Sequence, residues 1–292
     1  MNLVGTMPVR GDDWVLGLSV RVALMWCDTL VVRLHGEPGN AGRILGEIHA
    51  TDSRLSWVYR ADEKWDEMNH RQELLSLARV HGATHIAMID CDEILSANLL
   101  PTIRSSIEQL PRHAMLSLPG YNLRSGLTKY HSNGIWGNRW FSTAFKDDPR
   151  AGWHGDKFHH REPEGVSWTP RRTVNHGAGG ILHLWGANER RLKAKHALYK
   201  LTERLRFPGK DVAKIDQEFS WAIHGEPGHR MYGTPKTWTY ADVPASWWAP
   251  YAGLITEHLH LDDEPWQESQ CRKLLGEHGR EKFVGLDLFG VI

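Results

Sequence analysis

Three carboxylates follow a short run of mostly apolar residues in the segment HIAMIDCDEIL, residues 85–95. HIAMI has the composition of a buried strand, and Asp90 and Asp92 stand two positions apart at its end. Because side chains alternate along an extended strand, both carboxylates would point to one face and Cys91 to the other. Two such groups suit Mg²⁺ or Mn²⁺ shared with a diphosphate, since these ions keep few protein ligands. The segment therefore predicts a cation or phosphate site at a strand end.

The elements before this segment alternate between helical and strand patterns, which is typical of a parallel α/β sheet. The patterns predict helices over 13–26, 41–50 and 65–82, and strands over 29–34, 54–60 and 84–89. Open sheets of this kind bind ligands at the carboxyl ends of their strands. The acids therefore stand where this fold would hold its ligand.

The second part of the chain is rich in Trp, Gly and His. We expect a helix over 96–111, strands over 113–121, 137–145 and 179–185, an irregular loop over 150–165, and helices over 188–205 and 268–279. In the strand 179–185, alternation would place Ile181, His183 and Trp185 on one face. An imidazole among apolar neighbours needs a partner, which is a hydrogen-bonding core group or a metal.

Composition and charge narrow the class of protein. The 292 residues carry 35 Lys and Arg against 35 Asp and Glu, so no long-range basic field predicts binding to nucleic acid or to an anionic membrane. Cys27, Cys91 and Cys271 are too widely spaced for a disulfide framework or a zinc knuckle, which indicates a reducing compartment. The longest apolar stretch, VLGLSVRVALMW, is interrupted by Arg21 and too short to span a bilayer. We expect a soluble, cytoplasmic protein of one core domain with elaborations.

Several segments together resemble the glycosyltransferase family 2 type with a GT-A fold. In that family an apolar strand ends in an Asp-x-Asp motif, here IDCDEIL. MPVRGDDWVL and CDTLVV are similar to the segments of its first two strands, residues 65–93 to the helix and strand that lead into the motif, and GGILHLWGANERRLKAKHALYK to a later strand that ends in a metal-binding His. The resemblance covers about residues 4–205.

The resemblance implies an α/β fold of GT-A-like, Rossmann-like architecture, with a mostly parallel sheet flanked by helices and a mixed α+β acceptor-side half. It divides the chain into a nucleotide-sugar-binding half (1–110), an acceptor-side and metal-completing half (111–205) and a C-terminal extension (206–292). It further implies a metal-dependent enzyme that moves a sugar from a nucleotide-diphosphate sugar, expected to be a UDP-sugar, to a hydroxyl acceptor.

Carried over by position, the resemblance implies that Asp90 touches the donor nucleotide or the metal, and that Asp92 and His183 are metal ligands. A mixed carboxylate and imidazole site favours Mn²⁺ over Ca²⁺, with Mg²⁺ as the other candidate. Arg10 and Arg71 are candidates for the donor's diphosphate or nucleoside, because a guanidinium forks onto phosphate oxygens; the alternative is a surface arginine.

Further candidates lie in the second half of the chain. Lys195 and Tyr199 share one helical face and would reach the phosphates, unless they are a solvated face and a packing ring. Among the 14 Trp residues we expect acceptor stacking from Trp136, Trp140, Trp153 and Trp168, although core packing is the ordinary role of such rings.

Two segments depart from the family pattern. LHGEPGNAG replaces the usual acidic, Ser and Asp turn, which leaves the donor's base open, and GWHGDKFHHREPEG replaces the usual Trp-Gly and His-Glu arrangement. The candidates for the catalytic base are therefore Asp156 and Glu162, then His159, with Asp216 and Glu218 as a fallback.

Three other readings compete with the glycosyltransferase. The first is a haloacid-dehalogenase-like phosphohydrolase with Asp90 as nucleophile, although Ile94 stands where that family has Thr or Val. The second is a non-catalytic protein that binds carbohydrate or nucleic acid on Trp platforms. The third is a zinc hydrolase built on HGDKFHH, which lacks a helical pair of histidines. The acceptor stays open: a saccharide, a lipid-linked glycan, a protein or a modified nucleic acid.

Overall fold

The structure is a computed structural model that describes residues 1–61, 66–155, 157, 160–225 and 237–292. These residues form two compact units, each assembled from three segments of the chain. Unit 1 consists of Met1–Gly120, Arg139–His183 and Pro244–His260, and unit 2 consists of Tyr121–Asn138, Leu184–Val243 and Leu261–Ile292. The division into functional regions 1–110, 111–205 and 206–292 stays a prediction.

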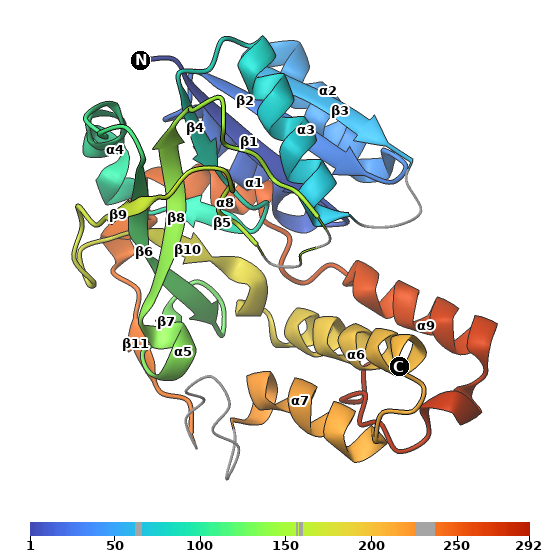
Figure 1. Ribbon diagram of the computed structural model, residues 1–292. Coiled ribbons are helices and arrows are strands. Elements are labelled where there is room, and N and C mark those ends of the chain that lie inside the picture. Colours follow the sequence, from blue (N-terminus) through green and yellow to red (C-terminus); the bar gives the residue numbers. More distant parts are fainter. Residues whose placement is uncertain (62–65, 156, 158–159, 226–236) are drawn as a thin grey trace. The chain divides into compact units, whose positions relative to one another are not determined.

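A central sheet organises unit 1 (Figure 1). Its first half is wholly parallel, in the order β4, β1, β2, β3. These strands are β1 (Leu3–Val9), β2 (Thr29–His35), β3 (Leu55–Arg60) and β4 (His85–Met88). Beyond β4 the sheet becomes mixed: β8 (Arg139–Lys146) runs antiparallel to β4, β6 (Ala114–Arg124) runs antiparallel to β8, and β9 (Thr169–Arg171) runs parallel to β6. This confirms the α/β class with a parallel half followed by a mixed half.

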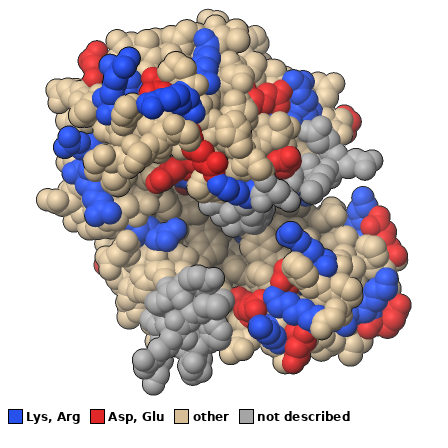
Figure 2. All heavy atoms as spheres, in the orientation of Figure 1, with Lys and Arg blue, Asp and Glu red and all other residues tan. Residues whose placement is uncertain are grey.

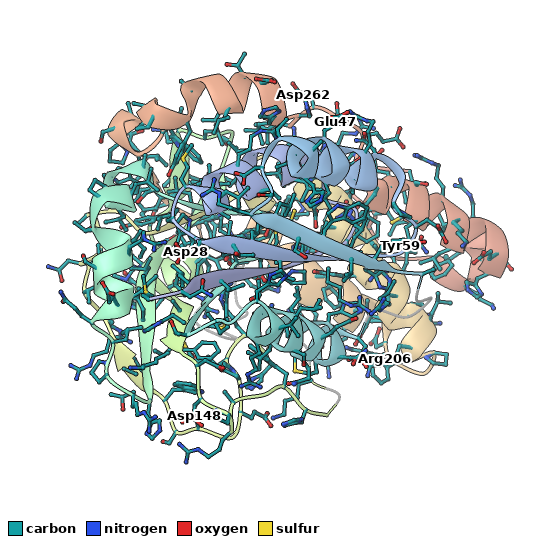
Figure 3. All side chains as sticks on the ribbon, turned by 90° about the horizontal axis from the view of Figure 1, so that it is seen from above. Asp28, Glu47, Tyr59, Asp148, Arg206 and Asp262 are labelled. Carbon is teal, nitrogen blue, oxygen red and sulfur yellow. The ribbon has the colours of Figure 1, made fainter. Side chains whose placement is uncertain are left out.

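Helices cover both faces of the parallel strands, as Figure 3 shows when the sheet is seen nearly edge-on. Helices α1 (Asp13–Leu24) and α2 (Gly39–Thr51) lie on one face and α3 (Glu67–Val80) on the other. Strands β1, β2 and β4 are buried on both sides, which explains why they read as apolar runs, whereas in the edge strand β3 only Leu55 is buried. Unit 1 also contains α4 (Leu100–Glu108), α8 (Ala252–His258) and the 3₁₀ turns η1 (Ala97–Leu99), η4 (Ala245–Trp247) and η5 (Ala249–Tyr251).

The local sequence of helix α3 determines where this helix begins and ends before β4 and the acidic segment. The Asp66 side chain accepts a hydrogen bond from the backbone N–H of Asn69 and caps the first turn. Leu74, Leu75 and Ala78 pack into the core, as their spacing predicts. Gly82 adopts a φ of +72° after the last turn, which confirms the expected glycine cap and turns the chain into β4.

Unit 2 is mainly helical. Its helices are α5 (Gly134–Gly137), α6 (Glu189–Arg206), α7 (Val212–His224) and α9 (Trp266–His278), with 3₁₀ turns η2 (Leu184–Gly186) and η6 (Arg280–Phe283). Helix α6 packs against both α7 and α9. The end of β6 pairs with β7 (Lys129–His131), which pairs with β11 (Tyr240–Asp242).

Two sequence-based expectations are wrong in detail. The strand expected over 179–185 is only Ile181–His183 (β10), so Trp185 belongs to the 3₁₀ turn that follows and does not share a strand face with His183. Helix α7 was not expected, although Val212, Ile215, Phe219 and Ala222 recur at helical spacing along it; of these, Ile215 and Ala222 are buried.

Candidate functional site

The acidic segment forms a turn rather than the end of an extended strand. Strand β4 ends at Met88, and the backbone N–H of Glu93 donates to the carbonyl of Asp90 at 3.0 Å. The expectation that alternation places Asp90 and Asp92 on one strand face is therefore wrong in its geometry. Asp90 forms ion pairs with Arg71 and Arg161, whereas Asp92 lies beside His183.

Asp92 lies beside His183. Strand β5 (Glu93–Leu95) pairs antiparallel with β10, and this register sets His183 opposite Glu93. The His183 Nε2 is 3.4 Å from the Asp92 Oδ1, and both side chains are about one-fifth exposed, at 22% and 18%. The structure thus brings together Asp92 and His183, two of the three predicted metal ligands, beyond the carboxyl end of β4.

The start of β10 is fixed by close contacts with the chain after β5. Ser96 donates its backbone N–H to the carbonyl of Gly180, and its hydroxyl oxygen accepts from the Gly180 N–H at 2.9 Å. Gly179 adopts a φ of +108°, and a Cβ there would lie 2.7 Å from the Asn98 side chain. This position therefore requires glycine, and it sets the path of the strand that carries His183.

Phe141, on strand β8, supports the His183 ring. The two rings meet edge to face, with centroids 5.5 Å apart. Gly120 makes room for this phenylalanine, because a Cβ at Gly120 would lie 2.8 Å from the Phe141 ring. The imidazole orientation thus depends on a glycine in β6.

Asp90 is held by two arginines. Arg71 Nη2 lies 3.1 Å from its Oδ1, and Arg161 Nη1 lies 3.2 Å from its Oδ2. Arg161 also donates to both oxygens of Glu93, at 2.6 and 2.7 Å, and to the carbonyls of Met88 and Ser142. Since Arg161 thereby satisfies five acceptors, it fixes the acidic turn to β4 and β8.

Burial and charge oppose one another at these carboxylates. Burial alone would raise the pKa of Asp90, but the guanidinium groups of Arg71 and Arg161 hold it well below its usual range. At Glu93 burial prevails over the attraction of Arg161, and with the nearby Asp90 charge it raises the pKa of that carboxyl. Asp90 is therefore the group that stays ionised throughout the neutral range.

A cavity of about 420 Å³ opens over these residues. Its lining includes Arg71, Asp90, His183, Trp140 and Glu162. The Ser142 hydroxyl donates to the exposed Glu162 at 2.5 Å and thereby orients this carboxylate. A volume of this size fits a small-molecule ligand.

The donor set fits a divalent cation with few protein ligands. A carboxylate and an imidazole at 3.4 Å can converge on an ion that takes its other ligands from phosphate and water. Among the residues that the structure describes, no group of three or more His, Cys, Asp or Glu side chains is gathered to hold a metal. Asp90 is engaged with arginines, so Asp92 and His183 are the two side chains placed for this role.

The remaining predicted residues fall into two groups. Arg10 directly follows β1 and is half-buried in unit 1. Lys195 and Tyr199 lie on α6 in unit 2, where Lys195 stands over the Trp185 ring at 5.8 Å and Tyr199 packs edge-on against His196. Their roles at the donor stay predictions.

The structure places the candidates for the catalytic base in different surroundings. Glu162 lines the cavity with Asp90, whereas Asp156 and His159 lie outside the described residues. The fallback pair is bound in unit 2: Asp216 pairs with the buried Lys200 at 2.6 Å, and Glu218 pairs with Lys210 at 2.5 Å. Glu162 is thus the described candidate that faces the cavity.

The four tryptophans named for stacking also differ. Trp140 lines the cavity, and Trp136 packs in unit 2 against Trp221 and Trp238 in stacked geometry. Trp153 is 4% exposed in the core, and Trp168 packs against the same core cluster. Acceptor stacking is therefore a wrong expectation for Trp153, whose ring is used by the core.

Arg161 and Glu93 were missed as site residues. Glu93 stands in the acidic segment itself, and three carboxylates at a buried strand end require a counter-charge. This requirement predicts that a basic side chain is buried beside the three carboxylates. It did not identify Arg161, because the loop 150–165 offers several basic residues and no periodicity to place them.

Comparison with known proteins gives only distant likenesses. No protein-family model and no curated protein matches the chain. Among solved structures, it is similar to a mannosyltransferase, PcManGT from Pyrobaculum calidifontis in complex with GDP-Man and Mn²⁺, at 9% identity over 94% of this chain and 74% of that one, with a TM-score of 0.40. HddC from Yersinia pseudotuberculosis matches at 12% identity over 63% of this chain and 94% of that one, with a TM-score of 0.39.

A third similar structure is mannose-1-phosphate geranyltransferase from Thermus thermophilus, at 9% identity over 82% of this chain and 76% of that one, with a TM-score of 0.32. At such identities and TM-scores these likenesses carry no argument about activity. The fold class rests on the strand order and on the helices that flank the sheet. In the described part of the chain, no helix has the length and apolar character needed to cross a membrane.

Proposed function

We propose that this protein is a metal-dependent glycosyltransferase of the family 2 type that moves a sugar from a nucleotide-diphosphate sugar to a hydroxyl acceptor. The observation that carries the proposal is the pair Asp92 and His183, 3.4 Å apart, of which His183 lines a cavity together with Asp90, Arg71 and Glu162. Carboxyl ends of parallel strands are where such sheets bind nucleotides.

Asp92 and His183 would hold the divalent cation, Mn²⁺ or Mg²⁺. When bound, the cation would stabilise the negative charge of the departing diphosphate. Asp90 stays ionised because Arg71 and Arg161 lower its pKa. It can therefore accept hydrogen bonds from hydroxyl groups of the nucleotide sugar. The second partner of Arg71, Glu67, lies 3.0 Å from it and keeps this guanidinium in place at the cavity wall.

Glu162 is the proposed general base. It would accept the proton of the acceptor hydroxyl as that oxygen attacks the anomeric carbon. The hydrogen bond from Ser142 holds one Glu162 oxygen, and the exposure of this carboxylate lets an acceptor reach it. The arrangement thus supplies a donor side and a base in one cavity.

A thermal-shift panel tests the proposal. Nucleoside diphosphates and nucleotide sugars with uridine, guanosine or adenosine bases are added with and without Mn²⁺ to the wild type and to Asp92→Asn. We expect one nucleotide to raise the melting temperature only with Mn²⁺, and the shift to vanish in Asp92→Asn. The variant Asp262→Asn, an exposed carboxylate of unit 2 labelled in Figure 3, is the matched control and should respond like the wild type.

The opposite result also has a clear meaning. If no nucleotide stabilises the protein and beryllium fluoride with Mg²⁺ does, the transferase proposal is wrong and Asp90 is a phosphohydrolase nucleophile. If the nucleotide shift persists unchanged in Asp92→Asn, the metal assignment is wrong while the nucleotide site stands.

A further inference from the structure

Among the described residues, two arginines beside Trp140 have no acidic partner. Arg139 lines the cavity next to this tryptophan, and the guanidinium carbon of Arg172 lies over the Trp140 ring, 4.5 Å from its centroid. Within the described residues, neither arginine forms an ion pair with a carboxylate, and both are exposed. A pair of uncompensated cations thus flanks an aromatic wall of the cavity.

Elsewhere in the protein, arginines are commonly neutralised by partners. On the face shown in Figure 2, Lys and Arg atoms lie beside Asp and Glu atoms over much of the surface. Arg33, Arg54 and Arg79, for example, each pair with an acidic side chain. The chain carries equal numbers of acidic and basic residues, so an excess of positive charge does not account for the two arginines beside Trp140, which lack an acidic partner among the described residues.

His176 adds a third group to this wall. Its ring meets Trp140 edge to face with centroids 4.7 Å apart. Partial burial and the nearby Arg172 lower the pKa of His176, so the imidazole is neutral at neutral pH and can donate or accept a hydrogen bond. The wall therefore combines a flat apolar ring with two cations and one neutral polar ring.

This wall lines the same cavity as the residues proposed for the donor but is offset along β8 from the contact between Phe141 and His183. Phe141 contacts His183 and lies under Arg161, whereas Arg139 precedes Phe141 by two residues on β8. Two residues of a strand span about 6 to 7 Å, which is about the width of a pyranose ring. Glu162, the proposed base, lines the same cavity as Arg139 and Trp140.

We infer that the acceptor carries an anionic group, a phosphate or a carboxylate, and that Arg139 and Arg172 bind it while Trp140 supports its sugar-like or apolar body. The inference rests on the proposed function and names the acceptor class of the same site. A guanidinium binds either anion through paired N–H donors, and an aromatic ring beside it adds contact area at little entropic cost. A neutral acceptor would leave both cations without a partner.

The two arginines could equally bind the donor's diphosphate. The experiment therefore distinguishes an anionic acceptor from the donor's diphosphate. Two probes of equal ring size are compared by isothermal titration calorimetry: glucose 6-phosphate, which carries the anion, and glucose, which does not. In separate titrations, the nucleoside diphosphate found in the thermal-shift panel is added with Mn²⁺. Each titration uses the wild type, Arg139→Gln, Arg172→Gln and a control.

The control is Arg206→Gln. Arg206 is likewise an exposed arginine over an aromatic ring, 5.3 Å from the Phe207 centroid, but it belongs to unit 2 and is labelled in Figure 3. Circular dichroism and melting temperature establish that each variant is folded. Substituting an exposed arginine is expected to leave the fold intact.

We expect glucose 6-phosphate to bind at least tenfold more tightly than glucose, and this preference to fall about tenfold in Arg139→Gln and Arg172→Gln but not in Arg206→Gln. The preference should also weaken as NaCl is raised. Equal binding of the two sugars, or a preference that survives in both variants, would overturn the inference.

The nucleotide titrations identify which idea fails. If the arginine substitutions weaken binding of the nucleoside diphosphate and leave binding of glucose 6-phosphate unchanged, the arginines belong to the donor site. The acceptor assignment is then wrong. If the sugar phosphate binds through these arginines but no nucleotide binds, the anionic subsite stands and the glycosyltransferase proposal fails.

Discussion

The guanidinium of Arg161 lies between Asp90 and Glu93, with its Nη1 3.2 Å from the Asp90 Oδ2 and 2.6 Å from the Glu93 Oε1. Glu93 is buried, with a side chain only 3% exposed. The cation therefore compensates two carboxylates at the point where the proposed donor site begins. Without it the acidic turn would hold uncompensated charge in a poorly solvated place.

Arg161→Gln should destabilise the protein by about 3 to 5 kcal/mol, because breaking a buried ion pair leaves the opposite charge unpaired. Urea denaturation followed by tryptophan fluorescence measures the loss. Arg43→Gln removes an exposed pair with Glu47 on helix α2 and should stay close to the wild type. Equal stability of Arg161→Gln and Arg43→Gln would show that Arg161 is not needed to compensate the turn.

Gly120→Ala should lower stability and weaken Mn²⁺ binding together. The new Cβ would lie 2.8 Å from the Phe141 ring, which must move away from its contact with His183. Overpacking of this kind costs about 1 to 3 kcal/mol. Denaturation and Mn²⁺ titration of the same sample test both effects.

Gly46→Ala is the matched control for that substitution. Gly46 lies in helix α2, and a Cβ there meets nothing within 4 Å. Alanine should therefore stabilise the helix by about 0.5 to 1 kcal/mol and leave Mn²⁺ binding unchanged. If Gly120→Ala keeps full metal affinity, Phe141 does not orient the imidazole.

Two buried histidines of unit 2 should make the protein sensitive to acid. Burial lowers the pKa of both His131 and His196 from 6.5 to about 3. The unfolded chain binds these protons at the ordinary pKa, so their contribution is fully present above pH 6.5 and is lost as the pH falls from 6.5 toward 3. The slope per imidazole reaches about 1.4 kcal/mol per pH unit.

His131→Phe tests this slope. The imidazole is packed among the rings of Trp136, Trp238 and Tyr240, which suits a phenyl ring. Urea midpoints at pH 7.5 and pH 5 should differ less for His131→Phe than for the wild type, whereas the exposed His81→Asn should keep the wild-type difference. An unchanged difference in His131→Phe would contradict the assignment.

Glu162→Gln should lower sugar transfer about 10²- to 10⁴-fold, because an amide cannot accept the acceptor's proton. Binding of the nucleotide should be retained, since Glu162 is not among the groups proposed for the donor. Turnover and calorimetry on the same preparation separate the two effects. Glu37→Gln, an exposed carboxylate after β2, is the control and should transfer at the wild-type rate. Transfer by Glu162→Gln at that rate would move the base to another residue.

The sequence predicted the parallel half of the sheet well because local signals there agree with the tertiary structure. Buried strands read as apolar runs, and α3 carries both its cap residue and its apolar stripe. The place of the acids shortly after β4, and the approach of His183 to Asp92, agree with the family resemblance, which combines several segments.

Other features of the site could not be predicted from the hydrophobic periodicity of the sequence. The turn at Asp90 and the role of Arg161 depend on charge compensation between the acidic segment and a loop 68 residues further along the chain. Trp153 and Trp140 are the same residue type, yet Trp153 is in the core and Trp140 lines the cavity, because burial is decided by tertiary packing. Helix α7, by contrast, was within reach of the pattern, because Val212, Ile215, Phe219 and Ala222 recur at helical spacing between the Asp211 cap and His224.

Binding of Mn²⁺ is the most direct test of the central claim that Asp92 and His183 form a metal site. Electron paramagnetic resonance of free Mn²⁺ measures the bound fraction in wild type, Asp92→Asn and His183→Ala, with Asp262→Asn and His81→Asn as matched controls. The account predicts saturable binding in wild type and in both controls, and affinity reduced about tenfold or more in each site variant. Full Mn²⁺ affinity in Asp92→Asn or His183→Ala would contradict it.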